Sequence, residues 1–491
     1  MKKIFVFLIC FASVFTCFGC KKKDNLEILG KNNTVYSIEI DLDVEQKSAK
    51  VVQTIDFINN TNSILKVLKL NLYPQFFEEG ATHNVISSTK LANTYPNGMS
   101  YAKFDIDRVL VKGVDIPVLY SGEYEEILNV DLGSSLMPNE RVELGIEYSF
   151  QMPNCNHRFG YGENTINLGN FYPIMCVYES GSFVENGYSP NGDPFYSDMA
   201  NYIVSISVPN EYIVASTGVK QSENTIENKK IVTYKATMVR DFAMVVSDKF
   251  QVKSKKVDKV DVLYYYFEDI NSDQSLQAGI DSINTFSKLF GKYPYQTYSV
   301  VQTDFIHGGM EYPNLVMISA DIENSDDYKN VIVHETAHQW WYGIVGNDEM
   351  KNPWLDEALT EFSTVLFYDE NEGYNLTHEK MIKASKENYS LFVTVYQDVL
   401  GKIDTSMRDC KSYSTEPEYT YCTYVKGVLM FDSLYHLVGK DKFIKSLKTY
   451  FEQCKYKNAT PKDLILAFEE TCKTNATNFF DSWISGKVVI R

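Results

Sequence analysis

The hydrophobic pattern changes once along this 491-residue chain, and that change limits the folds it can adopt. From about residue 35 to 250, apolar residues alternate with polar ones, as in Val142, Leu144, Ile146, Tyr148 and Phe150. Alternation with period two is typical of antiparallel strands that have one face in a core and the other in solvent. After about residue 255 the pattern is mostly helical. We therefore expect an α+β protein with an antiparallel β domain first and a mainly α domain second.

The start of the helical half is visible in the residues themselves. An apolar strand at residues 260–267 leads into a helix that Gly291 ends. The apolar stripe of that helix consists of Leu276, Ile280, Ile283 and Phe290. No Pro/Ser-rich linker separates the two halves, so we expect the two domains to pack closely.

The N-terminus predicts export from the cytoplasm. Lys2 and Lys3 precede an uncharged apolar run from residue 4 to 18, shorter than the roughly 20 residues that span a bilayer. Such a segment is typical of a secretory signal peptide, here residues 1–19. The following Gly19-Cys20 resembles a bacterial lipobox, with Cys20 as the lipidated residue. We expect an extracytoplasmic protein that is lipid-anchored to the bacterial cell membrane, or secreted if the lipobox is not used.

Composition excludes some classes of partner and leaves the cysteines open. With 64 acidic and 47 basic residues the formal charge is −17, which argues against a nucleic-acid partner. The 44% of hydrophobic residues exclude a disordered chain. None of the six cysteines beyond Cys20 has C-x-x-C spacing, so a thiolate metal site has little support. Free thiols and local disulfides (Cys410–Cys422, Cys454–Cys472) both remain open.

One short motif carries chemistry. His334-Glu335-Thr336-Ala337-His338 is an H-E-x-x-H sequence, in which two histidines four residues apart share one face of a helix and can bind one Zn²⁺. Glu335 adjoins that face and is placed to act as a general base without binding the metal. The alternative is a pair of buried structural histidines on a core helix.

A third ligand is predicted eighteen residues further on. Asn352 and Pro353 favour a helix start, with Asn352 as the cap, and Glu357 lies in the first turn of that helix. Glu357 would complete a His₂Glu site for one zinc ion per chain, with one position left open for catalysis. Glu361, one turn later, either orients a ligating histidine or is a solvated carboxylate.

These residues resemble those of the zinc aminopeptidases related to aminopeptidase N, within the gluzincin group. That family has H-E-x-x-H, eighteen residues and then Glu in a Trp-Leu-Asn-Glu setting, and this chain has Trp354-Leu355-Asp356-Glu357. The family's Gly-Ala-Met-Glu-Asn motif is matched by Gly308-Gly309-Met310-Glu311-Tyr312. Its Tyr-x-Lys-Gly motif is matched by Tyr424-Val425-Lys426-Gly427. The motifs occur in the family's order.

The resemblance implies a fold and a domain plan. It implies a saddle-like N-terminal β domain, residues 20–255, and a thermolysin-like zinc peptidase domain, residues 256–491. The chain ends soon after Trp483, near the end of the family's catalytic domain. We therefore expect a short form of the family with a more open site.

The resemblance also implies an activity and residue roles. The implied activity is hydrolysis of the N-terminal bond of peptides with a free N-terminus, using zinc-activated water and Glu335 as general base. The hydroxyl of Tyr424 would stabilise the oxyanion. Glu311, with Gly308, Gly309 and Met310, would bind the substrate N-terminus.

Two departures and two alternatives qualify this interpretation. Tyr312 replaces the family's Asn, and the β-domain residue that helps bind the amine cannot be assigned among Tyr172, Tyr178 and Glu179. An endopeptidase or another zinc hydrolase of the same fold would use the same metal site. An inactive peptide-binding surface lipoprotein is the third reading.

Overall fold

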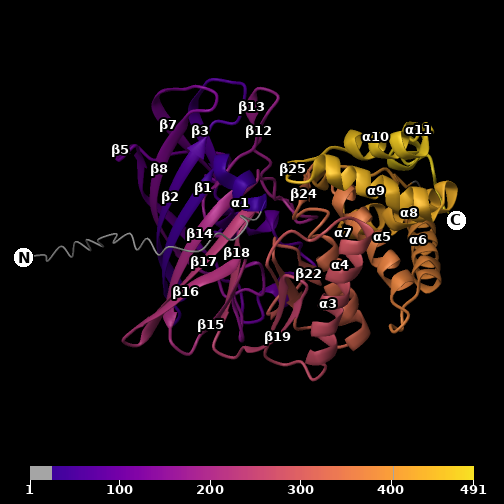
Figure 1. Ribbon diagram of the computed structural model, residues 1–491, viewed down its shortest axis with the longest axis horizontal. Helices are drawn as coiled ribbons and strands as arrows, with labels where there is room; N and C mark the ends of the chain where they lie inside the picture. The colour runs from indigo at the N-terminus through magenta and orange to yellow at the C-terminus, as the bar shows by residue number, and fades with distance from the viewer. Residues whose placement is uncertain (1–24, 402, 491) are drawn as a thin grey trace, which may run out of the picture.

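The computed structural model describes residues 25–401 and 403–490 (Figure 1). The expected signal peptide 1–19 and the lipidation site Cys20 lie outside the described residues. The N-terminal half consists mainly of strands, and the C-terminal half, at the opposite end of the long axis, consists mainly of helices. The expected α+β class is therefore confirmed.

The largest element of the β half is an eight-stranded sheet. Its strands alternate between buried and exposed residues, as the period-two pattern predicts. All neighbouring strands are antiparallel except β1 and β14. The order across the sheet is β16 (Val219–Ile226), β17 (Lys229–Val239), β14 (Ala200–Pro209), β1 (Val35–Asp43), β2 (Ser48–Ile58), β8 (Arg141–Gln151), β4 (Lys103–Val111) and β5 (Val114–Ile116).

Smaller sheets complete this half. One four-stranded sheet has the order β15 (Ile213–Ser216), β18 (Ala243–Ser247), β10 (Ile166–Gly169) and β9 (Phe159–Tyr161). The other has the order β11 (Ile174–Met175), β3 (Leu65–Asn71), β7 (Ile127–Leu136) and β6 (Leu119–Ser121). A hairpin is formed by β12 (Tyr178–Glu179) and β13 (Ser182–Phe183). Short helices in this half are α1 (Asn25–Leu29) and α2 (Leu91–Thr94).

The C-terminal half contains a five-stranded sheet on which helices α3 (Ser272–Leu289) and α4 (Ser325–Ala337) pack. Its order is β19 (Gln251–Val257), β20 (Val260–Tyr266), β21 (Thr297–Thr303), β23 (Leu315–Ser319) and β22 (Gly309–Met310). The expected domain boundary at 255/256 falls inside β19. Because β19 pairs with β20 along its whole length, all of β19 belongs to the five-stranded sheet of the C-terminal half.

Eight α-helices of eight or more residues follow β20 in the part of the chain that the structure describes. They are α3 (Ser272–Leu289), α4 (Ser325–Ala337), α5 (Trp354–Glu370), α6 (His378–Leu400), α8 (Lys426–Val438), α9 (Lys440–Cys454), α10 (Pro461–Cys472) and α11 (Thr477–Ile484). The predicted stripe of α3 is buried. Helix α5 begins one residue later than predicted, with Pro353 at the cap position. No helix within 25–401 or 403–490 has both the length and the apolar character needed to cross a bilayer.

A buried arginine joins the two halves. Arg240, at the end of β17, donates hydrogen bonds to the Tyr342 carbonyl at 2.5 Å and to Asn458 Oδ1 at 2.7 Å. A third contact reaches the carbonyl of Lys457 in the strand pair β24 (Val345–Gly346) and β25 (Lys457–Asn458). Because the side chain is 1% exposed, these acceptors replace the water that the guanidinium loses.

Candidate zinc site

The H-E-x-x-H residues lie at the C-terminal end of α4. Asn324 caps the start of this helix by accepting hydrogen bonds from the backbone N–H groups of Asp326 and Asp327. His338 follows the last helical residue and keeps helical dihedrals, so it stays on the same face as His334. His338 is buried, and 12% of the His334 side chain is exposed.

Glu357, in the first turn of α5, completes a triangle of donor atoms. The Nε2 atoms of His334 and His338 are 3.2 Å apart. Glu357 Oε2 is 3.2 Å from His338 Nε2 and 3.4 Å from His334 Nε2. Zinc bonds of 2.0–2.1 Å in a tetrahedron separate donor atoms by about 3.3–3.4 Å, so the three atoms fit zinc without rearrangement.

The hydrogen positions around this triangle also call for a cation. His338 Nδ1 is 3.0 Å from the Trp341 carbonyl, which can only accept, so the ring hydrogen lies on Nδ1. His334 Nδ1 is 3.4 Å from Glu361 Oε1, so its hydrogen points to that carboxylate. Both Nε2 atoms therefore turn a lone pair toward the Glu357 carboxylate. A metal ion bound between them would accept electron pairs from the two nitrogens and from the carboxylate. Glu361 thus contacts His334 and is not a purely solvated carboxylate.

Glu335 lies beside the triangle with one oxygen unpartnered. Its side chain is 5% exposed, and Oε2 has no hydrogen-bond partner. Burial raises the pKa of Glu335 from 4.5 to about 7, with His334 and His338 opposing the shift. Burial alone would raise the pKa of Glu357, but the two histidines lower it below its usual range. One buried carboxylate is therefore about half protonated near neutral pH, and the other stays ionised beside the histidines.

The edge strand β22 brings Glu311 to the same place. Gly308 precedes the strand, Gly309 and Met310 form it, and Glu311 follows it. One atom from each of Glu311, Glu335 and His338 lies within 4.8 Å of the other two. Glu311 is 3% exposed, its Oε1 is unpartnered, and burial raises its pKa well above the usual value. A buried carboxylate with a free oxygen is suited to a cationic group of a ligand.

Tyr312, the departure from the family motif, turns away from this site. Its hydroxyl donates to Asn170 Oδ1 in the β half at 2.6 Å. Its carbonyl accepts a hydrogen bond from Gln339 Nε2 at 3.0 Å, and Gln339 follows His338 directly. The residue therefore ties the Glu311 strand to the β half and to the end of α4.

The β half contributes residues that the sequence did not indicate. Asp193 lies within 4.8 Å of both Glu311 and Glu357, measured between ligand atoms, and pairs with the buried Arg158. Tyr172 instead donates to Asp241, away from the cavity, and Tyr178 and Glu179 form the β12 hairpin. Asp193 lies in the Gly- and Pro-rich segment 153–200, and that composition is the only sequence signal that could have pointed to it.

Tyr424 reaches the triangle from a π-helical turn, η5 (Tyr421–Val425), between α7 (Glu416–Thr420) and α8. Its hydroxyl donates to Glu357 Oε1 at 2.5 Å. A β-carbon at Gly427 would overlap the β-carbon of Ala358 on α5, so the glycine permits the close approach of α8. Such π-helical turns are frequent at functional sites because they change the direction of one side chain.

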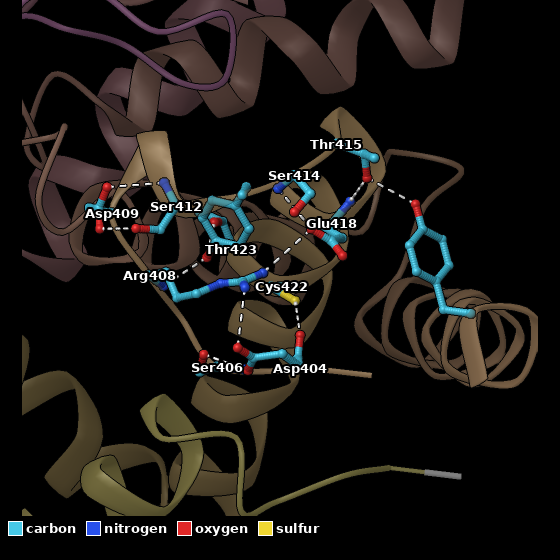
Figure 2. A network of polar contacts seen from close by, with 12 residues as sticks. Asp404, Ser406, Arg408, Asp409, Ser412, Ser414, Thr415, Glu418, Cys422 and Thr423 are labelled. Atoms are coloured by element: carbon cyan, nitrogen blue, oxygen red, sulfur yellow. Dashed lines mark hydrogen bonds and ion pairs between the residues drawn. The ribbon is translucent and has the colours of Figure 1, made fainter. Parts of the chain in front are cut away.

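The segment before η5 is held by a polar network (Figure 2). Arg408 contacts Asp404 at 3.2 Å and Glu418 at 3.6 Å, so it joins the loop to α7. The Lys426 ammonium donates to the carbonyls of Thr405 at 2.7 Å and Trp483 at 2.6 Å. Lys426 of the Tyr-x-Lys-Gly motif thus anchors the turn that carries Tyr424 and does not face the cavity.

A cavity of about 450 Å³ connects these residues and is lined by both halves. Six carboxylates border it: Asp193, Glu311, Glu335, Glu357, Glu361 and Glu416. This concentration of negative charge needs cations to compensate it. One metal ion would compensate only part of the charge, so a second positive group of a ligand could also bind here. Cys410 and the other five described cysteines are free thiols, so no disulfide shapes this region of the described chain.

Comparisons with known proteins agree with this geometry. Residues 274–483 match the model of the peptidase family M1 domain. Aminopeptidase B of Mus musculus is 29% identical over 196 residues, which are 37% of this chain and 28% of the relative. Aminopeptidase N of Lactococcus lactis subsp. lactis is 24% identical over 257 residues, 47% of this chain and 28% of the relative. The chain thus spans less than a third of the length of these curated relatives.

Solved structures extend the likeness to both halves. The M1 zinc metallopeptidase of Deinococcus radiodurans, in a mutant bound to a Tyr-Ser-Ala substrate, superposes with a TM-score of 0.66 at 14% identity. The superposition covers 94% of this chain and 96% of that one, so the whole fold is shared. The match of residues 274–483 to the peptidase family M1 domain, together with these relatives, confirms the resemblance of this region to the zinc aminopeptidases related to aminopeptidase N.

Proposed function

We propose that the protein is a zinc-dependent aminopeptidase that hydrolyses the N-terminal bond of peptides. The observation that carries the proposal is the position of Glu311, whose free, buried oxygen lies beside the general-base candidate Glu335 and the metal-binding histidines. A carboxylate there binds the free α-ammonium of a substrate and so places the first peptide bond over the reacting groups.

His334, His338 and Glu357 would hold the metal. Zinc held by these residues would supply Lewis acidity, which makes water a usable nucleophile near neutral pH. Glu335 takes a proton from the attacking water and returns it to the leaving amine. Its pKa of about 7 suits both directions of transfer.

Tyr424 and Asp193 complete the proposed machinery. The Tyr424 hydroxyl, now on Glu357, is placed to turn to the oxyanion, where one such donor contributes about 3–4 kcal/mol. Asp193 adds a second carboxylate near Glu311, so the ammonium would contact residues from both halves. The ion pair with Arg158 holds the Asp193 carboxylate in place.

A pair of fluorogenic peptides tests the proposal, one with a free N-terminus and one acetylated. We expect rapid cleavage of the free peptide only, and a much smaller preference in Glu311→Gln. Equal cleavage of both peptides by the wild type would favour an endopeptidase. No cleavage of either by zinc-loaded protein would favour the peptide-binding reading, and activity that survives Glu335→Ala would overturn the general-base role.

We further propose that the mature protein begins at a lipid-modified Cys20 and is anchored outside the cytoplasm. The support is the basic start, the uncharged run 4–18 and the Gly19-Cys20 junction. Mass spectrometry of the membrane fraction should find a lipid-modified N-terminal cysteine. A mature protein that starts at any other residue would remove the anchor.

A further inference from the structure

A second cluster of metal-binding side chains lies in the helical half, away from the site described above. Asp432 and His436 are four residues apart on α8, and His378 begins α6. Suitable ligand atoms of these three residues all lie within 4.8 Å of one another. Helices α5, α6 and α8 pack together here (Figure 1).

The two histidines converge on one carboxylate oxygen. His378 Nε2 is 2.8 Å and His436 Nε2 is 3.4 Å from Asp432 Oδ1. A protonated His378 forms an ion pair at the first contact, and the same oxygen can accept a second hydrogen bond from His436 when no metal is bound. The three side chains are also close enough to bind one divalent cation, for which the 2.8 Å contact of His378 would widen by about 0.5 Å.

A further carboxylate accepts the hydrogen of the other ring nitrogen of His378, as is common for histidines that bind metals. Asp369, near the end of α5, lies 3.0 Å from His378 Nδ1, so that nitrogen carries the hydrogen and Nε2 is directed at Asp432. The same arrangement holds at the first site, where Glu361 of α5 contacts His334 Nδ1. One helix thus supplies the orienting carboxylate to both clusters.

Burial and access fit a bound ion. Only 6% of the Asp432 side chain and 17% of that of His378 are exposed, whereas His436 is 69% exposed. A hollow of about 690 Å³ opens at the cluster, so an ion and its water can enter. Lys383 and Lys386 also line the hollow, but Glu379 and Glu387 balance their charge.

We propose that His378, Asp432 and His436 form a second divalent-metal site, which zinc can occupy, in addition to the His334–His338–Glu357 site. Two imidazoles and one carboxylate are a donor set that zinc accepts, with water as the fourth ligand. Glu357 and Asp369 are twelve residues apart on α5, which places the second site about 18 Å along the helix from the first. An ion there links α5, α6 and α8 and leaves the catalytic groups untouched.

Equilibrium dialysis of the full chain against excess Zn²⁺, followed by metal analysis, tests the proposal. We expect two zinc ions per wild-type chain and one per chain in His436→Ala, whose side chain is exposed and whose loss does not disturb the core. His436→Ala should keep wild-type cleavage of a free-amine peptide. His83→Ala removes an exposed histidine of the β half and should still bind two ions.

A second variant isolates the new site from the first. Glu357→Gln should bind one ion, and with Co²⁺ it should keep a visible absorption band that the double variant with His436→Ala loses. One zinc per wild-type chain would overturn the proposal. Two zinc ions in both wild type and His436→Ala would also overturn it, because the extra ion would then lie elsewhere.

Discussion

The backbone of Gly309 lies against the side chain of Glu335, so closely that a β-carbon at position 309 would come within 2.5 Å of the Glu335 carboxyl carbon. Strand β22 can therefore lie this close to helix α4 only because residue 309 has no side chain. This contact sets where the proposed general base can lie.

We expect Gly309→Ala to lower kcat by about 10–100-fold without unfolding the protein, because the methyl group must displace the Glu335 carboxylate. Steady-state kinetics on a free-amine peptide, with circular dichroism for the fold, measures this. Gly308→Ala is the matched control, since a β-carbon there would lie 3.6 Å from the nearest atom of Val331. Equal kinetics of the two variants would show that the close approach does not position Glu335.

The hydroxyl of Tyr424 gives a second prediction. Tyr424→Phe should reduce kcat by about 10²–10³-fold with little change in KM, because the lost donor acts mainly on the oxyanion. Tyr421→Phe, on the same π-helical turn but stacked on Phe392, should retain activity. A Tyr424→Phe enzyme with wild-type kcat would remove the residue from the mechanism.

Glu361 should affect the metal through His334. Glu361→Ala leaves His334 Nδ1 without its carboxylate, and we expect zinc affinity to fall by about 10–100-fold. Competition with a metal-binding dye measures the affinity directly. Glu372→Ala, an exposed carboxylate just beyond α5, serves as the control and should bind zinc as the wild type does. Unchanged affinity in Glu361→Ala would make its contact with His334 incidental.

Lys426 predicts a pH dependence of stability. Burial lowers the pKa of Lys426 from 10.5 to about 8, so the folded state favours the neutral amine more than the unfolded state does. Its contribution to stability is therefore complete above pH 10.5 and is lost as the pH falls through 8. Between about pH 7.5 and about pH 9.5 the wild type should gain roughly 2 kcal/mol over Lys426→Met in the free energy of unfolding. Urea denaturation at both pH values measures this gain, and an unchanged difference would mean that the ammonium is not held in a dry site.

The sequence predicted the parts of this molecule that local spacing determines. Period-two alternation indicated the strands β1, β8 and β14, and the four-residue spacing of His334 and His338 indicated a shared helix face. Glu357 was predictable because a short connection between two helices limits where the third ligand can lie.

Residues that tertiary packing brings together were not predictable. Asp193 reaches Glu311 only because a long segment of the β half folds over the catalytic half. His378 and Asp432 are 54 residues apart and meet only when α6 packs on α8. Neither pair shares a local pattern, so no periodicity or motif points to it.

The buried guanidinium of Arg240 has a consequence for how the protein can be divided. Its hydrogen bonds to Tyr342 and Asn458 cross from one half to the other, and its side chain is 1% exposed. A hydrogen bond to a charged group contributes about 1.5–3 kcal/mol net, so separating the halves would lose two such contributions even though water then hydrates the guanidinium. We therefore expect that the catalytic half does not fold as a separate unit. A destabilising substitution in the β-sheet should lower the temperature of one cooperative transition in which the zinc ligands unfold as well.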